Sequence, residues 1–229
     1  MTFLALEIRR TLRAPAFLIV TLGMPVALLL IEGSLYGSTG STYLMSGMAA
    51  YGALMAAIST GARVATERTA GWQRQLRLTP LSPPTYLAAK AVVSMMVALP
   101  PIVAVALAGA VVQGVRLPVG GWLQAVAGVW LATLPFAVLG LLIGQVATGQ
   151  NVQAYSMGSM LTLSLAGGLW IPVTQFPGWL ADLARVLPSY WLAAVGHGGE
   201  LGTAVLVLGG YTVALAAAVM ARYRRGGDR

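Results

Sequence analysis

The sequence predicts an all-α membrane protein that forms a single transmembrane domain over residues 1–229, and three observations support this prediction. Hydrophobic residues make up 58% of the chain, charged residues only 9%, and the mean hydropathy is +0.79. Soluble domains carry about 25% charged residues, so a water-soluble enzyme is strongly disfavoured. The charges divide the chain into uncharged runs that suit membrane-spanning helices of about 20 residues. The cations also gather in segments that would share one side of a membrane.

Six membrane-spanning helices are predicted from the uncharged runs. Their expected ranges are 16–35, 43–63, 86–112, 122–146, 153–170 and 201–223. Pro100 and Pro101 are expected to kink the third of these helices. The uncharged run from 117 to 181 is too long for one span, so it is divided at the polar stretch 148–153.

The positive-inside rule orients this arrangement independently of hydropathy. Every Lys and Arg except Arg116 and Arg185 falls on the side that holds both chain termini. Both termini are therefore expected in the cytoplasm. The net charge of +8 is then explained by topology and by attraction to anionic lipid, and nucleic acid is not expected as a partner.

Residues 1–14 are predicted to form an amphipathic helix that lies in the inner membrane interface. Leu4, Ile8 and Leu12 recur every four residues and so share one helical face, while the charged residues take other faces. Pro15 then lets the chain turn into the first span. The alternative is that the segment only extends the first span into water.

The stretch from 67 to 84 is the only substantial polar segment between predicted spans. A helix is predicted over 67–80, with Glu67 near its start, where the helix dipole favours an anion, and Pro80 at its end. Such a short helix buries little apolar area alone, so it needs lipid or a partner protein. The alternative is an ordinary basic loop that only follows the positive-inside rule.

The segment 172–199 falls on the predicted external side, yet it is too apolar for an exposed loop. A pair of short helices that dips back into the outer leaflet resolves this conflict, because such backbone is tolerated where protein buries it. Pro177 and Pro188 suit the first residues of the two helices. The alternative is a passive interfacial anchor rich in aromatic residues.

Few residues in this chain suit catalysis or metal binding. With no Cys and one His, a thiolate or His-rich metal site is excluded. An intramembrane serine protease would need a serine and a histidine on facing spans, but His197 lies in a glycine-rich turn outside them. Glu32, near the outer end of the first span, is either an interface residue that reaches headgroups or a carboxylate that lines a cavity and attracts a cationic substrate.

Two groups of residues resemble a known family. The first is the polar segment and the start of the third span: Glu67, Gly71, Leu76, Arg77, Thr79, Pro80, Leu81, Ser82 and Lys90. The second follows the fifth span: Gly167, Gly168, Pro172, Phe176, Pro177, Leu180, Leu187, Pro188 and Trp191. Their order and spacing resemble the permease subunits of the type-2 family of ATP-binding-cassette (ABC) exporters, and the resemblance extends over essentially the whole chain.

The resemblance implies a multi-pass permease of a bacterial cytoplasmic membrane that is not itself an enzyme. It pairs with a second copy of itself or a homologous permease, and it works with separate ABC ATPase subunits. The chain lacks a phosphate-binding G-x-x-x-x-G-K-[ST] motif, so it binds no cofactor, and ATP and Mg belong to the partner ATPase. The apolar spans favour a hydrophobic or amphiphilic substrate, such as a drug, lipid or peptide, and the resemblance implies that this substrate is exported.

The resemblance also assigns roles to particular residues. A coupling helix over 67–80 would dock on the ATPase, with the N-terminal helix in support, through Glu67, Gly71, Trp72, Arg74, Leu76, Arg77, Arg9 and Arg10. The external hairpin over 172–199 would gate the translocation path through Pro172, Phe176, Pro177, Trp179, Pro188 and Trp191. Glu32 is a candidate for the path itself. The remaining alternatives are a membrane assembly or anchoring subunit without transport and, more weakly, an intramembrane protease.

Overall fold

The computed structural model describes residues 19–36, 40–71 and 83–225, and every regular element within these ranges is a helix. Four helices are long and apolar enough to cross a membrane, namely Ser41–Thr69, Pro84–Val111, Val119–Val146 and Leu201–Tyr223. A shorter apolar helix covers Ile19–Gly33. The expectation of an all-helical protein with several apolar spans is therefore confirmed, while the count of six spans stays a prediction.

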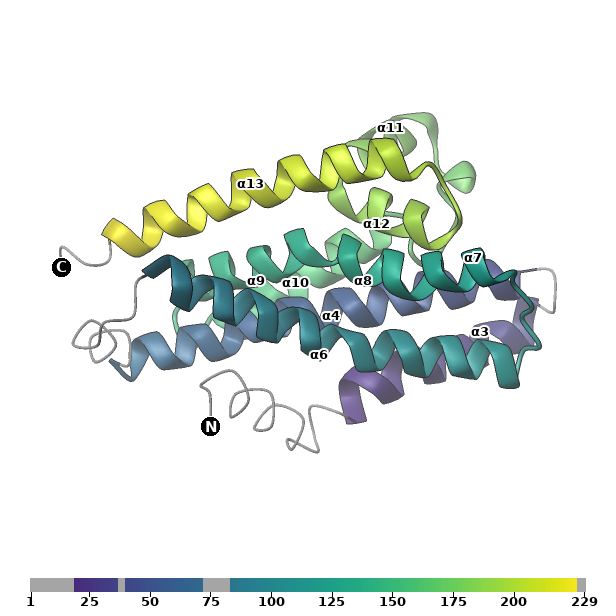
Figure 1. Cartoon of the computed structure of the whole chain (residues 1–229), viewed down its shortest axis with the longest axis horizontal. Coiled ribbons are helices and arrows are strands. Elements are labelled where there is room, and N and C mark those ends of the chain that lie inside the picture. Colours follow the sequence, from purple (N-terminus) through teal and green to yellow (C-terminus); the bar gives the residue numbers. More distant parts are fainter. Residues whose placement is uncertain (1–18, 37–39, 72–82, 226–229) are drawn as a thin grey trace.

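The helices follow one another along the chain with short connections (Figure 1). In order they are η1 (Ile19–Gly23), α3 (Met24–Tyr36), α4 (Ser41–Thr69), α6 (Pro83–Val111), α7 (Val119–Leu123), η2 (Gln124–Gly128), α8 (Val129–Ala132), α9 (Leu134–Val146), α10 (Val152–Ala166), η3 (Val173–Gln175), α11 (Gly178–Val186), α12 (Pro188–Gly196) and α13 (Leu201–Arg225). The predicted N-terminal helix over 1–14 lies outside the described residues.

Helix α4 is the centre of the bundle. Its most apolar window is 94% buried inside the chain, and it contacts α3, α6, α9, α10 and α12. The contact with α9 is close because glycines face backbone: a Cβ atom on Gly61 would lie 2.2 Å from the Gly140 carbonyl oxygen, and one on Gly144 would lie 2.6 Å from that of Gly61. Small residues at this spacing let two helices approach within backbone contact.

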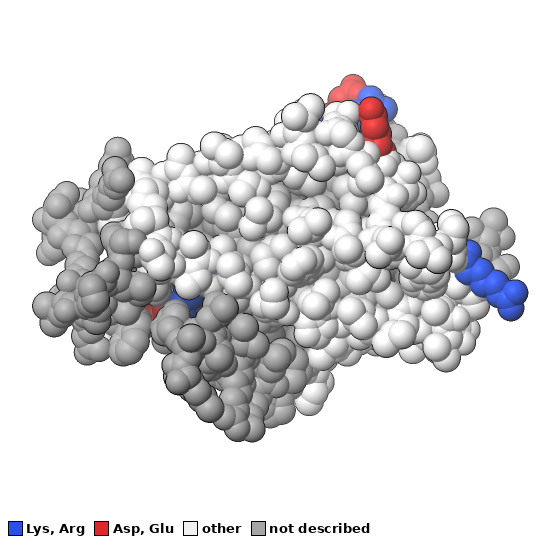
Figure 2. All heavy atoms as spheres, viewed as in Figure 1, with Lys and Arg blue, Asp and Glu red and all other residues white. Residues whose placement is uncertain are grey.

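Helix α13 lies at the edge of the bundle, where only 17% of its most apolar window is buried by the rest of the chain. Apolar side chains such as Val205, Leu206 and Val213 are exposed along it. Figure 2 shows that the visible flank of the molecule is almost free of charged residues, which lie toward its two ends. A surface of this kind suits hydrocarbon better than water.

The two ends of the bundle differ. At one end, here called the basic end, α4 finishes, α6 begins and α13 finishes with Arg222 and the residues after it. At the other, here called the hairpin end, α4 begins and α11 and α12 pack together (Figure 1). Helix α4, whose 29 residues span about 43 Å, connects the two ends.

Helix boundaries near the hairpin follow from glycine and proline. Helix α10 ends at Ala166, and Gly168 adopts a left-handed φ of +76°, which other residues rarely tolerate. Helix α11 begins directly after Pro177, and α12 begins at Pro188, in both cases where proline's fixed φ suits a helix start. The insertion of these two helices into a lipid leaflet stays a prediction.

Candidate functional site

A buried ion pair joins α4 and α6 at the basic end. The Lys90 ammonium donates to Glu67 Oε1 at 2.5 Å, and the Tyr86 hydroxyl donates to Glu67 Oε2 at 2.8 Å. The Lys90 side chain is 4% exposed and that of Glu67 is 21% exposed. A buried charge is tolerated only when it is paired, so each ion keeps the other in place. The helices that lead into and out of residues 72–82 are thereby fixed to each other.

Arg68, the residue next to this pair, connects α4 to α9. Its guanidinium donates to the carbonyl oxygens of Gln145 and Ala147, at the C-terminal end of α9. The last carbonyls of a helix lack intrahelical partners and carry partial negative charge, so a cation suits this position. The sequence offered one signal for this contact, which is the polar stretch after Val146 that marks a helix end.

The predicted coupling residues fall into two groups. Glu67 lies in the last turn of α4 rather than at the start of a separate helix, because no glycine or proline lies between Gly61 and Gly71 to end the helix earlier. Gly71 has a left-handed φ of +76°, and its N–H donates to the Arg68 carbonyl oxygen, which closes α4. The others lie outside the described residues and are Trp72, Arg74, Leu76, Arg77, Arg9 and Arg10.

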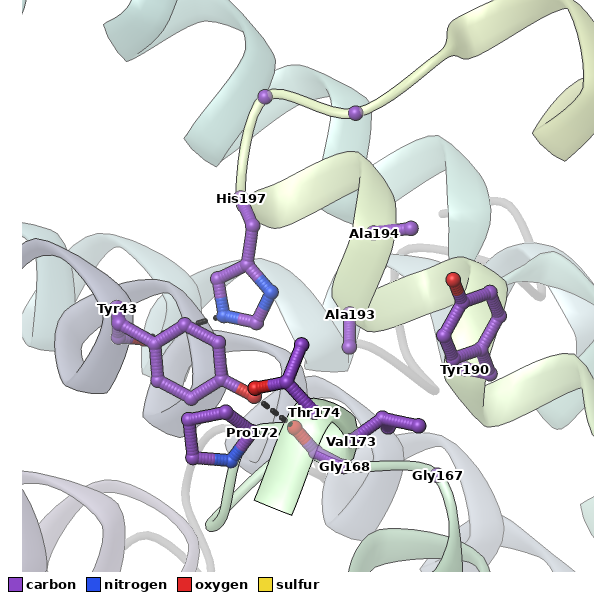
Figure 3. Close-up of a pocket in the computed structure, with 12 residues that line it drawn as sticks. Tyr43, Gly167, Gly168, Pro172, Val173, Thr174, Tyr190, Ala193, Ala194 and His197 are labelled. Atoms are coloured by element: carbon purple, nitrogen blue, oxygen red, sulfur yellow. Dashed lines mark hydrogen bonds between the residues drawn. The ribbon is translucent and has the colours of Figure 1, made fainter. Parts of the chain in front are cut away.

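At the hairpin end, His197 stacks on Tyr43 and holds the turn after α12 against the first turn of α4. The two rings are 3.8 Å apart and 12° from parallel, and His197 Nε2 lies 3.2 Å from the Tyr43 carbonyl oxygen. The Tyr43 hydroxyl donates to the Gly168 carbonyl oxygen at 2.5 Å (Figure 3). Burial lowers the pKa of His197 to about 4, against a smaller opposing effect of its backbone hydrogen bond, so the ring is neutral at pH 7.

A cavity of about 300 Å³ opens beside this stack. Its lining combines Tyr43 and His197 with Thr174 of η3 and with Tyr190 and Ala194 of α12 (Figure 3). Sequence reasoning missed this cavity because Tyr43 and His197 are 154 residues apart and neither belongs to a motif.

The predicted gate residues take different positions around the hairpin. Pro172 lines the cavity. Pro177 directly precedes α11, and Pro188 is the first residue of α12. The Trp191 indole donates to the Arg185 carbonyl oxygen at 2.9 Å and so ties α12 to α11. Trp179 is 71% exposed and faces away from the protein, while Phe176 is half-buried after η3.

Glu32 is half-buried in α3, near the hairpin end. Its Oε2 atom is buried and has no hydrogen-bond partner among the described residues. Gln113, on the chain after α6, donates to the Leu29 carbonyl oxygen at 2.7 Å and packs against Gly33. One carboxylate oxygen of Glu32 is thus buried within the chain, and both the interface role and the role on a translocation path stay predictions.

Among the residues that the structure describes, no three His, Cys, Asp or Glu side chains come together as metal ligands would. The His197 ring stacks on the Tyr43 ring and its Nε2 atom contacts the Tyr43 carbonyl oxygen, whereas a protease would pair a histidine with a serine. The described part of the chain therefore gives no support to the protease alternative.

Comparison with known proteins agrees with this arrangement of apolar helices. Residues 1–200 match the family described as ABC-2 type transporter. The chain is also 30% identical over 194 residues to YvfS, a predicted transport permease of Bacillus subtilis (strain 168), covering 80% of this chain and 78% of that protein. The chain belongs to the ABC-2 transporter family and is a multi-pass transport permease subunit.

Proposed function

We propose that this permease exports a hydrophobic or amphiphilic substrate, such as a drug, lipid or peptide, in a cycle driven by a separate ABC ATPase. The ATPase would bind ATP and Mg and would dock on the segment after α4 that carries Trp72, Arg74, Leu76 and Arg77, and on Arg9 and Arg10. The observation that carries the proposal is the pairing of Glu67 with Lys90, because it fixes together the two helices on either side of the proposed docking segment.

The proposed transmission runs through three helices. A movement of residues 72–82 would displace the end of α4 and the start of α6 together, because the buried ion pair of Glu67 and Lys90 joins these two helices. Arg68 would transmit the same movement to α9 through its hydrogen bonds to the carbonyl oxygens of Gln145 and Ala147. Helix α4 then carries it to the hairpin end, where Tyr43 contacts His197. ATP-driven closure of the ATPase would in this way change the external gate.

The translocation path is proposed to lie between two permease chains rather than within one. Helix α4 fills the centre of the chain, with 94% of its most apolar window buried. A second copy, or a homologous permease, would complete the path from the exposed apolar surfaces of the bundle. The protein would then act as a dimer in a bacterial cytoplasmic membrane, with both termini in the cytoplasm.

The docking proposal can be tested with a double charge reversal. The variant L76E/R77E is expected to reduce copurification of the ATPase at least tenfold and to abolish stimulation of ATP hydrolysis by the permease, because the apolar contact of Leu76 would be lost and the charge at residue 77 would be reversed. Arg116→Glu, at the exposed hairpin end, is the matched control and should leave both quantities unchanged. Unaltered copurification and hydrolysis in the double variant would refute the docking site and would favour an assembly or anchoring role.

A further inference from the structure

The cavity beside the Tyr43–His197 stack has the dimensions of a small-ligand site. It encloses about 300 Å³ between the start of α4, the turn at Gly168, η3 and α12. Small-molecule pockets begin at roughly this volume. The cavity therefore suits a small molecule, or one end of a larger one.

The lining of the cavity is uncharged at neutral pH. It contains no Asp, Glu, Lys or Arg, and His197 is neutral because burial lowers its pKa to about 4. An ion placed here would gain no counter-ion from the lining. Most of the remaining surface comes from aromatic rings, from Pro172 and Val173, and from alanines of α12 (Figure 3). A neutral and largely apolar ligand is the one that this lining favours.

Two hydroxyl groups can orient such a ligand. Thr174 is exposed on one side of the cavity, and Tyr190 is half-buried on the surface of α12. Among the described residues, neither hydroxyl takes part in a hydrogen bond within the protein. Gly198 and Gly199 are exposed on the rim and add no side chain that would close it. The cavity thus combines an apolar body with hydroxyls that can bind one polar substituent.

We propose that this cavity binds a neutral, largely apolar group that carries one hydrogen-bonding substituent, such as a phenol or an alcohol, at the hairpin end of the permease. The site lies between α4 and the hairpin of a single chain. Binding therefore requires neither the ATPase nor transport, and it can be measured even if the proposed function fails.

The charge preference can be measured with three ligands of similar size and different charge. Full-length permease in nanodiscs is titrated with 4-fluorophenol, 4-fluorobenzoate or 4-fluorobenzylammonium, and ¹⁹F line broadening is compared with that in empty nanodiscs. We expect saturable broadening for the phenol and at least tenfold weaker binding for both ions. Absence of saturable broadening with the phenol, or equal binding of either ion, would overturn the proposal.

Variants locate the binding to this cavity. Ala194→Phe should fill the cavity and weaken phenol binding at least tenfold, while Ala154→Phe, exposed on α10 outside the cavity, should bind as the wild type does. Thr174→Val keeps the shape of an exposed side chain and should weaken binding about twofold to tenfold, so the site can be tested even if Ala194→Phe does not fold. Wild-type affinity in Thr174→Val and in any folded Ala194→Phe protein would contradict the assignment.

Discussion

The Lys90 ammonium reaches across the interface between α4 and α6 to Glu67 at 2.5 Å, while Tyr86 donates to the second oxygen of the same carboxylate. Lys90 therefore neutralises the Glu67 carboxylate, although the two residues are 23 positions apart and lie on opposite sides of the proposed docking segment. The position of that segment relative to α4 and α6 depends on this contact.

Removal of one member of this pair should be more harmful than removal of both. Lys90→Met leaves the Glu67 carboxylate without its cation and should lower the free energy of unfolding by about 3 kcal/mol. The double variant K90M/E67Q should recover part of this loss, because no uncompensated ion remains. Denaturant unfolding in detergent micelles measures both changes, and strictly additive effects would show that the two residues do not interact.

Arg68 should be required for coupling between ATP hydrolysis and transport. Arg68→Gln removes two charge-assisted hydrogen bonds to the end of α9 and is expected to cost about 1.5–3 kcal/mol of stability. The number of ATP molecules hydrolysed for each substrate molecule moved should rise, because the C-terminal end of α9 is held less firmly to α4. Arg116→Gln, exposed at the hairpin end and far from Arg68, is the matched control. An unchanged ratio in Arg68→Gln would remove α9 from the transmission path.

The close contact of α4 with α9 should tolerate no added carbon at Gly61. In Gly61→Ala the new Cβ atom would lie 2.2 Å from the Gly140 carbonyl oxygen, so the helices must separate, and we expect a loss of at least about 2 kcal/mol of stability. Gly158→Ala is the control, because no atom lies within 4 Å of its Cβ position in α10. That variant should be neutral or more stable by about 0.5–1 kcal/mol. Equal effects of the two substitutions on thermal unfolding would contradict the packing described here.

His197 should make the stability of the hairpin end depend on pH. Its pKa is about 4 in the folded protein and 6.5 in the unfolded chain, so the unfolded chain binds more protons between these values. The contribution of His197 is therefore fully present above pH 6.5 and declines as the pH falls from about 6.5 to about 4. The difference in Tm between the wild type and His197→Gln should shift in favour of the variant over this window. A difference that stays constant from pH 7.5 to 4 would show that the ring is not buried as described.

The features that follow from local chain properties could be predicted from the sequence. Uncharged runs predict the long apolar helices, and Pro177 and Pro188 mark the starts of α11 and α12, because hydropathy and proline geometry act on neighbouring residues.

The contacts between distant residues could not be predicted in this way. Three such contacts are the pairing of Lys90 with Glu67, the contact of Arg68 with α9 and the stack of His197 on Tyr43. Each joins helices whose relative positions cannot be inferred from the residues next to them in the sequence. The sequence also places the end of the second span at residue 63 and the start of a new helix at Glu67, whereas residues 64–69 continue α4.

The central claim, that this permease exports amphiphilic molecules only when a partner ATPase drives it, is tested most directly by transport in proteoliposomes. The purified permease is reconstituted with and without the proposed partner ABC ATPase, and movement of rhodamine 6G, a fluorescent phospholipid and a hydrophobic peptide is followed. Movement of at least one of these should require the ATPase and hydrolysable ATP. Movement of the same molecule by the permease alone, or no movement of any of them while ATP is hydrolysed, would contradict the account.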